Sequence, residues 1–192
     1  MSNNPKTVAC FGGSKISTLM YDLLIRVGIL LGERGVGVFT GAYEGAMEAP
    51  ARGANRTKNG TSVGFTLKGK EGNSFLSQQV DCLELSSAIG FANVDFTTRL
   101  AGLFTADAFI VAAGGGIGTL FELVGLMIFN QKFWKAGRKK VAILRPEADN
   151  CEGWDQGSLD LLFALGKVEP EVRAMFRVVT TPEEAVAYVL GE

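Results

Sequence analysis

The stretch Ala108–Val124, AFIVAAGGGIGTLFELV, joins a short apolar run, three consecutive glycines and a helix-like pattern. The apolar run Ala108–Ala113 is short and bounded by turn residues, which predicts a buried strand. Beyond the glycines Gly114–Gly116, apolar residues recur at helical spacing over Leu120–Met127. A strand, a glycine turn and a helix start in this order predict an anion site. The first N–H groups of the helix lack partners, and glycines let a phosphate approach the backbone.

Glu122 lies one turn inside this expected helix, within reach of whatever the turn binds. A carboxylate beside a phosphate site is poorly suited to bind the phosphate itself, because like charges repel. Glu122 is better placed for a sugar hydroxyl or a water molecule. The alternative is structural, since a carboxylate near a helix N-terminus stabilises the helix dipole by roughly 0.3–1 kcal/mol.

Strand-like and helix-like segments alternate along the whole chain. The alternation predicts an α/β fold: one doubly wound, Rossmann-like domain over residues 1–192, with a mostly parallel sheet and helices on both faces. The expected strands are Thr7–Phe11, Gly37–Thr40, Thr61–Thr66, Cys82–Ser86, Ala108–Ala113, Lys140–Leu144 and Phe176–Val179. The expected helices are Ser17–Gly35, Val94–Thr105, Gly118–Asn130, Leu159–Leu165, Pro182–Leu190 and a short one after Gly45 that Pro50 kinks or delays. Lys68–Gln79 is polar, contains glycine, and is expected to be a loop or flap.

Three of the expected strands end in glycine turns: Gly12–Ser14, Gly41–Gly45 and Gly114–Thr119. In a parallel sheet the carboxyl ends of the strands meet at one edge, where doubly wound folds bind their ligands. Tight strand-to-helix turns often need glycine in any case, so a purely structural role is the alternative for each turn. The convergence of three such turns predicts a ligand site at this edge.

Standard nucleotide-binding fingerprints and histidine chemistry are both missing. The first turn reads GGSKIS, which is not G-x-G-x-x-G, and no G-x-x-x-x-G-K-[ST] loop occurs. The chain contains no histidine, the commonest metal ligand and the commonest general acid or base at neutral pH. A Ser-His-Asp or Cys-His nucleophilic site is therefore excluded, and no metal ion or other cofactor is expected. Acid–base chemistry is left to carboxylates, tyrosine, lysine, cysteine or water.

The composition is typical of one compact domain that binds neither nucleic acid nor a membrane. The chain has 192 residues, 47% of them hydrophobic, and a net charge of −1, so it has no field that would draw in nucleic acid. No apolar run is long enough to span a bilayer. Three widely spaced cysteines and no secretion signal indicate a reducing, cytoplasmic location. The basic run Lys132–Lys140 is expected to be the solvated end of the preceding helix, with a phosphate or nucleic-acid patch as the alternative.

The glycine motifs together resemble the Lonely Guy (LOG) family, over nearly the whole chain. GGGIGTLFE, Gly114–Glu122, is similar to the family's PGGxGTxxE signature and is the most specific match. TGAYEGAME, Thr40–Glu48, matches GGGxxGLMG loosely, and CFGGS, Cys10–Ser14, resembles the first-strand turn. Arg99 stands at the position of the family's arginine. Members are cytokinin riboside 5′-monophosphate phosphoribohydrolases, long mislabelled as lysine decarboxylases.

The resemblance implies a hydrolase that cleaves the N-glycosidic bond of an AMP-like nucleotide, its small-molecule partner, and releases a purine base and ribose 5-phosphate. It assigns Arg99 and Glu122 as the catalytic pair and implies a homodimer. The residues expected to bind phosphate or nucleotide are Gly13, Ser14, Gly41, Glu44, Gly45, Thr98, Gly115, Gly116, Ile117, Gly118 and Thr119. A surface position for Glu44 and a pairing of Arg99 with Asp95 on one helix face are the structural alternatives. A decarboxylase is excluded, because no lysine is placed for a Schiff base with pyridoxal phosphate.

Some residues depart from the family pattern. Gly114 stands where the family has proline, and Leu100 replaces the lysine that follows the arginine. Thr40 and Ala42 replace two glycines. Such changes occur among the wider LOG-like Rossmann proteins, which include molybdenum-cofactor carriers and nucleotide-sensing domains. They favour an alternative function, a protein that holds a phosphorylated pterin or nucleotide without cleaving it.

Overall fold

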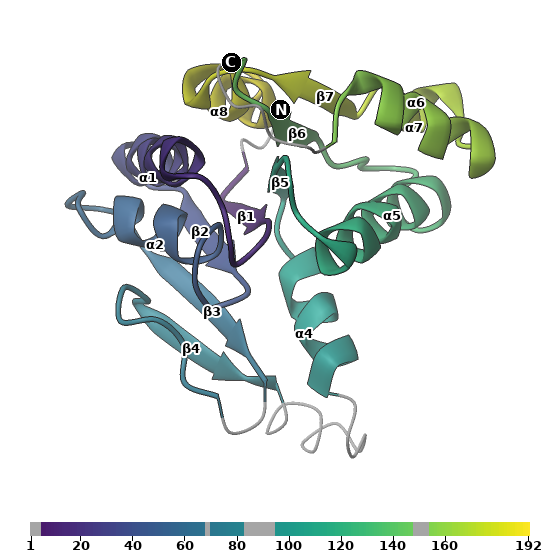
Figure 1. Cartoon of the computed structure of the whole chain (residues 1–192). Helices are drawn as coiled ribbons and strands as arrows, with labels where there is room; N and C mark the ends of the chain where they lie inside the picture. The colour runs from purple at the N-terminus through teal and green to yellow at the C-terminus, as the bar shows by residue number, and fades with distance from the viewer. Residues whose placement is uncertain (1–4, 68–69, 83–94, 148–153) are drawn as a thin grey trace.

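The computed structural model describes residues 5–67, 70–82, 95–147 and 154–192. Within them seven strands form one sheet in the order β4-β3-β2-β1-β5-β6-β7, and every neighbouring pair is parallel (Figure 1). The strands are β1 (Thr7–Phe11), β2 (Gly37–Thr40), β3 (Ser62–Thr66), β4 (Gln78–Asp81), β5 (Ala108–Ala112), β6 (Val141–Leu144) and β7 (Phe176–Val179). The prediction of a doubly wound α/β fold is confirmed.

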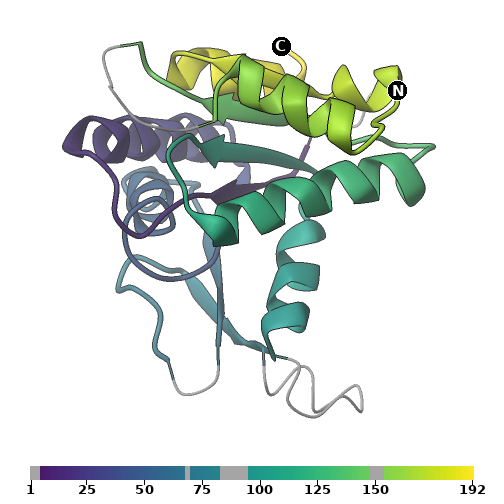
Figure 2. The same cartoon turned by 45° about the vertical axis from the view of Figure 1, so that its right-hand side comes forward.

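Helices cover both faces of the sheet (Figures 1 and 2). One face carries α1 (Thr18–Glu33), α2 (Glu48–Ala54) and α8 (Pro182–Leu190). The other carries α4 (Asp95–Phe104), α5 (Ile117–Lys132), α6 (Gln156–Leu165) and α7 (Pro170–Arg173). In the described part of the chain, no helix combines the length and the apolar character that crossing a bilayer requires.

Side chains of the central strands alternate between the two layers, because successive residues of a strand point to opposite faces. In β1, Val8 and Cys10 belong to the core under α1, whereas Ala9 and Phe11 belong to the core under α5. All five residues of β5 are buried. A strand covered on both faces needs a continuous apolar run, and this is the pattern from which the sequence predicts β5.

The fourth strand lies earlier in the chain than the sequence predicts. The structure places β4 at Gln78–Asp81, partly inside the expected loop Lys68–Gln79, and Cys82, where the expected strand Cys82–Ser86 begins, lies beyond its end. The remaining residues, Leu83–Ser86, lie outside the described part of the chain. β4 is an edge strand that pairs with β3 alone, so it tolerates polar residues and shows no apolar pattern.

Two short helices, α2 and α7, differ from what the sequence predicts or leaves open. Of the two effects expected of Pro50, the late start is confirmed: α2 begins at Glu48, so Pro50 lies in its first turn. A proline there loses no intrahelical hydrogen bond. The short helix α7, Pro170–Arg173, is absent from the sequence prediction, since a single turn is too short to show a helical period.

The expectation that the basic run Lys132–Lys140 is the solvated end of α5 holds only for the start of the run, where Lys132 is exposed in the last turn of the helix. The helix ends at Lys132, whereas Lys139 is partly buried. The Nζ of Lys139 donates to the carbonyl oxygens of Phe104 (3.0 Å) and Ala106 (2.6 Å), at the end of α4. A lysine stem can be buried when its amine still reaches oxygen acceptors, and charge in the sequence does not reveal this.

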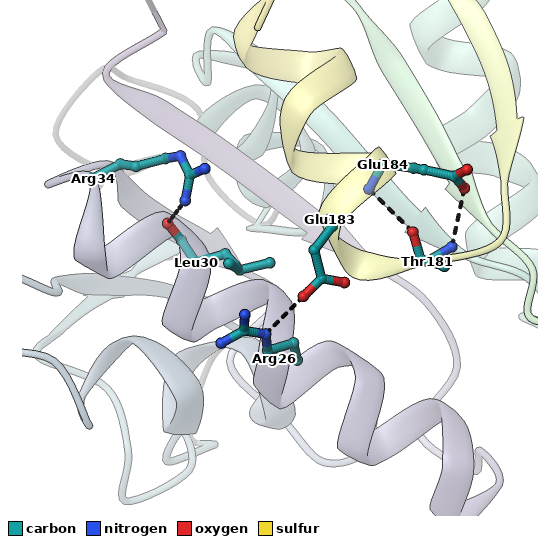
Figure 3. Close-up of polar contacts among 6 residues, drawn as sticks. All are labelled: Arg26, Leu30, Arg34, Thr181, Glu183 and Glu184. Carbon is teal, nitrogen blue, oxygen red and sulfur yellow. Dashed lines mark hydrogen bonds and ion pairs between the residues drawn. The ribbon is translucent and has the colours of Figure 1, made fainter.

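An ion pair joins α1 and α8 in their layer (Figure 3). The Nε of Arg26 lies 2.9 Å from Oε1 of Glu183. Thr181 and Glu184 form a capping box at the start of α8. An exposed ion pair contributes only about 0.2–1 kcal/mol, so the apolar contacts of these helices hold the layer together.

Candidate functional site

The order of the strands reverses between β1 and β5, at the centre of the sheet. Doubly wound folds bind ligands beyond the carboxyl ends of the strands at such a reversal. The turn Gly12–Ser14 follows β1 and the turn Gly114–Gly116 follows β5, so both lie at this point. The turn Gly41–Gly45 follows β2, the next strand along.

The first glycine turn packs against each of the other two. A Cβ built on Gly13 would lie 3.6 Å from Cα of Gly115, which brings the first and third turns together. A Cβ on Gly45 would lie 2.3 Å from the carbonyl oxygen of Ser14, and the N–H of Ala46 donates to the carbonyl of Gly13 at 3.0 Å. Glycine at position 45 is therefore required by the close approach of two turns, and φ there is +64°.

No side chain among the described residues caps the N-terminus of α5. Its N-cap residue, Gly116, has no side chain that could accept from the first N–H groups of the helix, and the first turn contains no acidic residue. The N–H of Leu120 donates to the carbonyl of Gly116 at 3.0 Å and closes the first turn. The N–H groups of Ile117, Gly118 and Thr119 precede that bond and point out of the helix end. An anion suits these donors, and the helix dipole adds positive potential.

The glycines of this turn differ in the space around them. A Cβ on Gly115 would lie 2.2 Å from Oγ1 of Thr119. Thr119 is 3% exposed, so its buried side chain packs against the turn. A Cβ on Gly116 or Gly118 would meet no atom within 4 Å. The side chain of Ile117 is 82% exposed, so only its backbone is available to the turn. A phosphate can reach the backbone at the two open glycines.

Glu122 lies one helical turn behind these open positions and is partly buried. Burial raises the pKa of its carboxyl from the ordinary 4.5 to about 7, and the positive charge of Arg99 opposes this rise. A carboxyl with such a pKa exchanges a proton readily at neutral pH, as a general acid or base must. Perturbed carboxyls beside a ligand site are candidates for catalysis.

Arg99 lies on α4 and ties together the ends of two strands. Its Nε donates to the carbonyl of Phe65 at 2.9 Å, and its Nη2 donates to the carbonyl of Gly41 at 3.0 Å. The side chain is 8% exposed, and its guanidinium lies 5.7 Å from the ring centroid of Tyr43. These bonds hold the β2 turn in place. Thr98, the preceding residue, is buried as well.

Glu44 and Ser14 line a cavity of about 450 Å³ next to the glycine turns, together with Tyr43, Glu48 and the segment Glu71–Ser74. A volume of this size suits a small organic ligand. Glu44 is therefore placed at a cavity, although its role there stays a prediction.

Sequence reasoning missed the residues that build the far wall of this cavity. The side-chain amide of Asn73 donates to the carbonyls of Ala42 (2.9 Å) and Tyr43 (3.1 Å). The hydroxyl of Tyr43 accepts from the N–H of Leu67 at 2.7 Å. These bonds join positions 24 to 31 apart in the chain, so no local pattern could reveal them. Ala42 has φ of +74°, which explains why the resembled motif has glycine there.

Known proteins resemble this chain in sequence and in structure. Over 129 residues, 64% of this chain, it is 30% identical to the pyrimidine/purine nucleotide 5′-monophosphate nucleosidase of Escherichia coli K12, and it spans 27% of that longer protein. The X-ray structure of TM1055, a structural-genomics target, matches with a TM-score of 0.66 at 25% identity, over 97% of this chain and 99% of that one. The molybdenum cofactor binding protein of Rippkaea orientalis matches with a TM-score of 0.64 at 17% identity, over 97% and 95%. At that identity the likeness shows the fold alone.

The family model of the SLOG cluster4 family matches residues 5–148. This range contains all three glycine turns, together with Arg99 and Glu122. The match covers most of the sheet and both strands of the reversal. The chain therefore belongs to the SLOG cluster4 family and is a LOG-like Rossmann protein.

Proposed function

We propose that the protein hydrolyses the N-glycosidic bond of a nucleoside 5′-monophosphate and releases a purine base and ribose 5-phosphate. One observation carries the proposal: a carboxyl with a pKa of about 7, Glu122, lies one turn behind a helix N-terminus that has no side-chain cap. The local likeness to a nucleotide 5′-monophosphate nucleosidase and the resemblance to the LOG signature support the same chemistry.

The phosphate binds the N–H groups of the first turn of α5, at the open positions Gly116 and Gly118. One helical turn, about 5.4 Å, separates that point from Glu122, a distance comparable with the length of a ribose 5-phosphate. The ribose therefore lies beside the carboxylate. The base extends towards the cavity that Ser14 and Glu44 line.

Hydrolysis breaks the bond between C1′ and the base nitrogen and adds a water oxygen at C1′. Positive charge develops on the sugar ring in the transition state, as in glycoside cleavage generally. Ionised Glu122 stabilises this charge and accepts a proton from the attacking water, and the departing purine nitrogen is protonated in turn. Arg99 stays cationic throughout, so its roles are to hold the β2 turn and to steady the phosphate, the ribose or the departing base.

A second candidate function is binding without hydrolysis, as a carrier or sensor of a phosphorylated pterin or nucleotide. The observation that favours it is the backbone of Gly114, whose φ is +87°. Proline cannot adopt a positive φ, so this turn differs in shape from the proline-containing turn of the LOG signature. Leu100, in place of the family's lysine, removes a second charge from the site.

We further propose a homodimer. Large apolar side chains recur along α5 at Ile117, Phe121 and Ile128, with exposed fractions of 82%, 52% and 49%. Phe96 on α4 extends this stripe, with its ring centroid 6.0 Å from that of Phe121. Exposed apolar patches of this kind are typical of protein–protein interfaces.

Incubation with AMP and N6-substituted AMP, followed by separation of the products, distinguishes the two functions. Free base and ribose 5-phosphate in equal amounts support the hydrolase. Nucleotide binding without release of base from any nucleotide supports the carrier, as does a phosphorylated pterin or nucleotide identified by mass spectrometry in the purified protein.

A further inference from the structure

A second cavity lies at the opposite edge of the sheet from the glycine turns. Its lining includes Lys6, Asp107 and Lys140, which directly precede β1, β5 and β6. Because the sheet is parallel, these residues mark its amino edge, whereas the glycine turns mark its carboxyl edge. The cavity has a volume of about 690 Å³, well within the range of small-molecule sites.

Positive charge dominates the lining. The lining contains four cations, Lys6, Arg138, Lys139 and Lys140, and one carboxylate, that of Asp107. This carboxylate is already engaged by its own neighbours: its Oδ2 accepts from the N–H of Lys6 (2.9 Å), and from the N–H and the hydroxyl of Thr7 (both 3.1 Å). These bonds fix the start of β1, and a single carboxylate balances only part of the positive charge of the lining.

Neutral groups, rather than carboxylates, hold two of the cations. Lys139 donates to two backbone carbonyls and lies 4.2 Å from the ring centroid of Trp134. The ammonium of Lys140 lies 5.3 Å from the ring centroid of Tyr188. A ring or a carbonyl fixes the position of a cation without cancelling its charge.

Two further carboxylates lie near this cavity, and one of them, that of Glu169, pairs with a lining cation. Glu169 lies 3.6 Å from Nη2 of Arg138, a long contact between partly exposed groups. The side chain of Glu192, next to the lining residue Gly191, pairs with Arg34 on α1 at 2.9 Å. Among the residues that the structure describes, no ion pair involves Lys6, Lys139 or Lys140.

We propose that this cavity binds a small molecule carrying a diphosphate or triphosphate group. Several fixed cations in one concave site recognise an anion with more than one charge, because each phosphate group can accept a separate charge-assisted hydrogen bond. Val189 and Leu190 form an apolar part of the lining, and a cavity of this size fits a compact ligand better than a polymer. The site is separate from the glycine turns and does not depend on their function.

Isothermal titration calorimetry with tripolyphosphate, at low ionic strength, tests the proposal on the full chain. We expect one ligand per chain. The double variant Arg138→Ala/Lys140→Ala is expected to bind at least about tenfold more weakly, because it loses two charge-assisted contacts. The control is Lys58→Ala/Lys135→Ala, which removes the same charge at exposed lysines outside this cavity and should leave affinity within about twofold.

Thermal unfolding of each variant shows whether it is folded. Lys6→Glu, at an exposed residue, offers a second test that does not disturb the core and should also weaken binding. The proposal is overturned if the unaltered protein does not bind tripolyphosphate at 1 mM, about the weakest affinity of interest. It is also overturned if both double variants lose affinity equally, or if Gly118→Asp at the glycine turn abolishes binding while Lys6→Glu does not.

Discussion

The guanidinium of Arg99 fills the space that a side chain at position 41 would occupy. Its Nη2 donates to the carbonyl of Gly41 at 3.0 Å, and a Cβ on Gly41 would lie 1.8 Å from the same nitrogen. Glycine at this position and arginine on α4 are therefore a matched pair, although 58 positions separate them. The pair fixes the turn after β2 against the end of β3.

Gly41→Ala tests this match. The added methyl group must displace a buried, hydrogen-bonded guanidinium, so we expect a loss of about 1–3 kcal/mol in the free energy of unfolding. Urea denaturation measures the change. Gly137→Ala is the control, because a Cβ there meets no atom within 4 Å and stability should stay within about 0.5 kcal/mol. Equal stability of the two variants would contradict the assigned contact.

Glu122 predicts a specific dependence of stability on pH. Its pKa rises from 4.5 to about 7 on folding, so between these values the folded protein holds a proton that the unfolded chain has released. The contribution of Glu122 to stability therefore falls as the pH rises from 4.5 to 7 and is constant above, with a total loss of up to about 3 kcal/mol.

Glu122→Gln removes this titration and keeps the size of the side chain. Denaturation of both proteins between pH 4.5 and 8.5 should show the variant gaining stability relative to the unaltered protein as the pH rises. Parallel stability curves for the two proteins would show that Glu122 titrates normally.

Gly118→Asp places a carboxylate at the open N-terminus of α5. A negative charge there suits the helix dipole, so stability should be unchanged or slightly higher. Binding of AMP should weaken by at least about tenfold, because the new carboxylate competes for the N–H groups and repels the phosphate. Gly118→Ala is the control, since its Cβ enters open space. Unimpaired AMP binding by the aspartate variant would move the phosphate site away from this turn.

Phe121→Glu tests the proposed homodimer. The residue is 52% exposed at the centre of the apolar stripe on α4 and α5, so a charge there should convert a dimer to a monomer in light scattering. Leu19→Glu, on α1 in the opposite layer and 40% exposed, should leave the mass unchanged. A monomeric unaltered protein, or a dimer that survives Phe121→Glu, would refute this interface.

The sequence predicts the elements of the fold that have a clear local pattern. The run Ala108–Ala112 is buried on both faces and is recognisable for that reason, and the parallel topology then brings the glycine turns to one edge. The edge strand Gln78–Asp81 escapes this reasoning because half of it faces solvent. The partial burial of Lys139 cannot be predicted from the sequence, because its amine donates to two backbone carbonyls that are 33 and 35 positions away.

The sequence likewise predicts one part of the candidate site and not the other. The glycine turns and the place of Glu122 behind one of them can be predicted, because strand, turn and helix are contiguous in the chain. The bonds of Arg99 to Gly41 and of Asn73 to Ala42 cannot, since they join distant segments. The raised pKa of Glu122 cannot be predicted from the sequence either, because it is caused by burial in the folded protein.

The rate of base release from AMP by Glu122→Gln, with AMP affinity measured on the same preparation, tests the central claim most directly. We predict that turnover falls by at least about 100-fold, the usual contribution of a general acid or base, while the dissociation constant changes by less than about threefold. A variant that releases base at the rate of the unaltered protein would contradict the claim and remove Glu122 from the reaction.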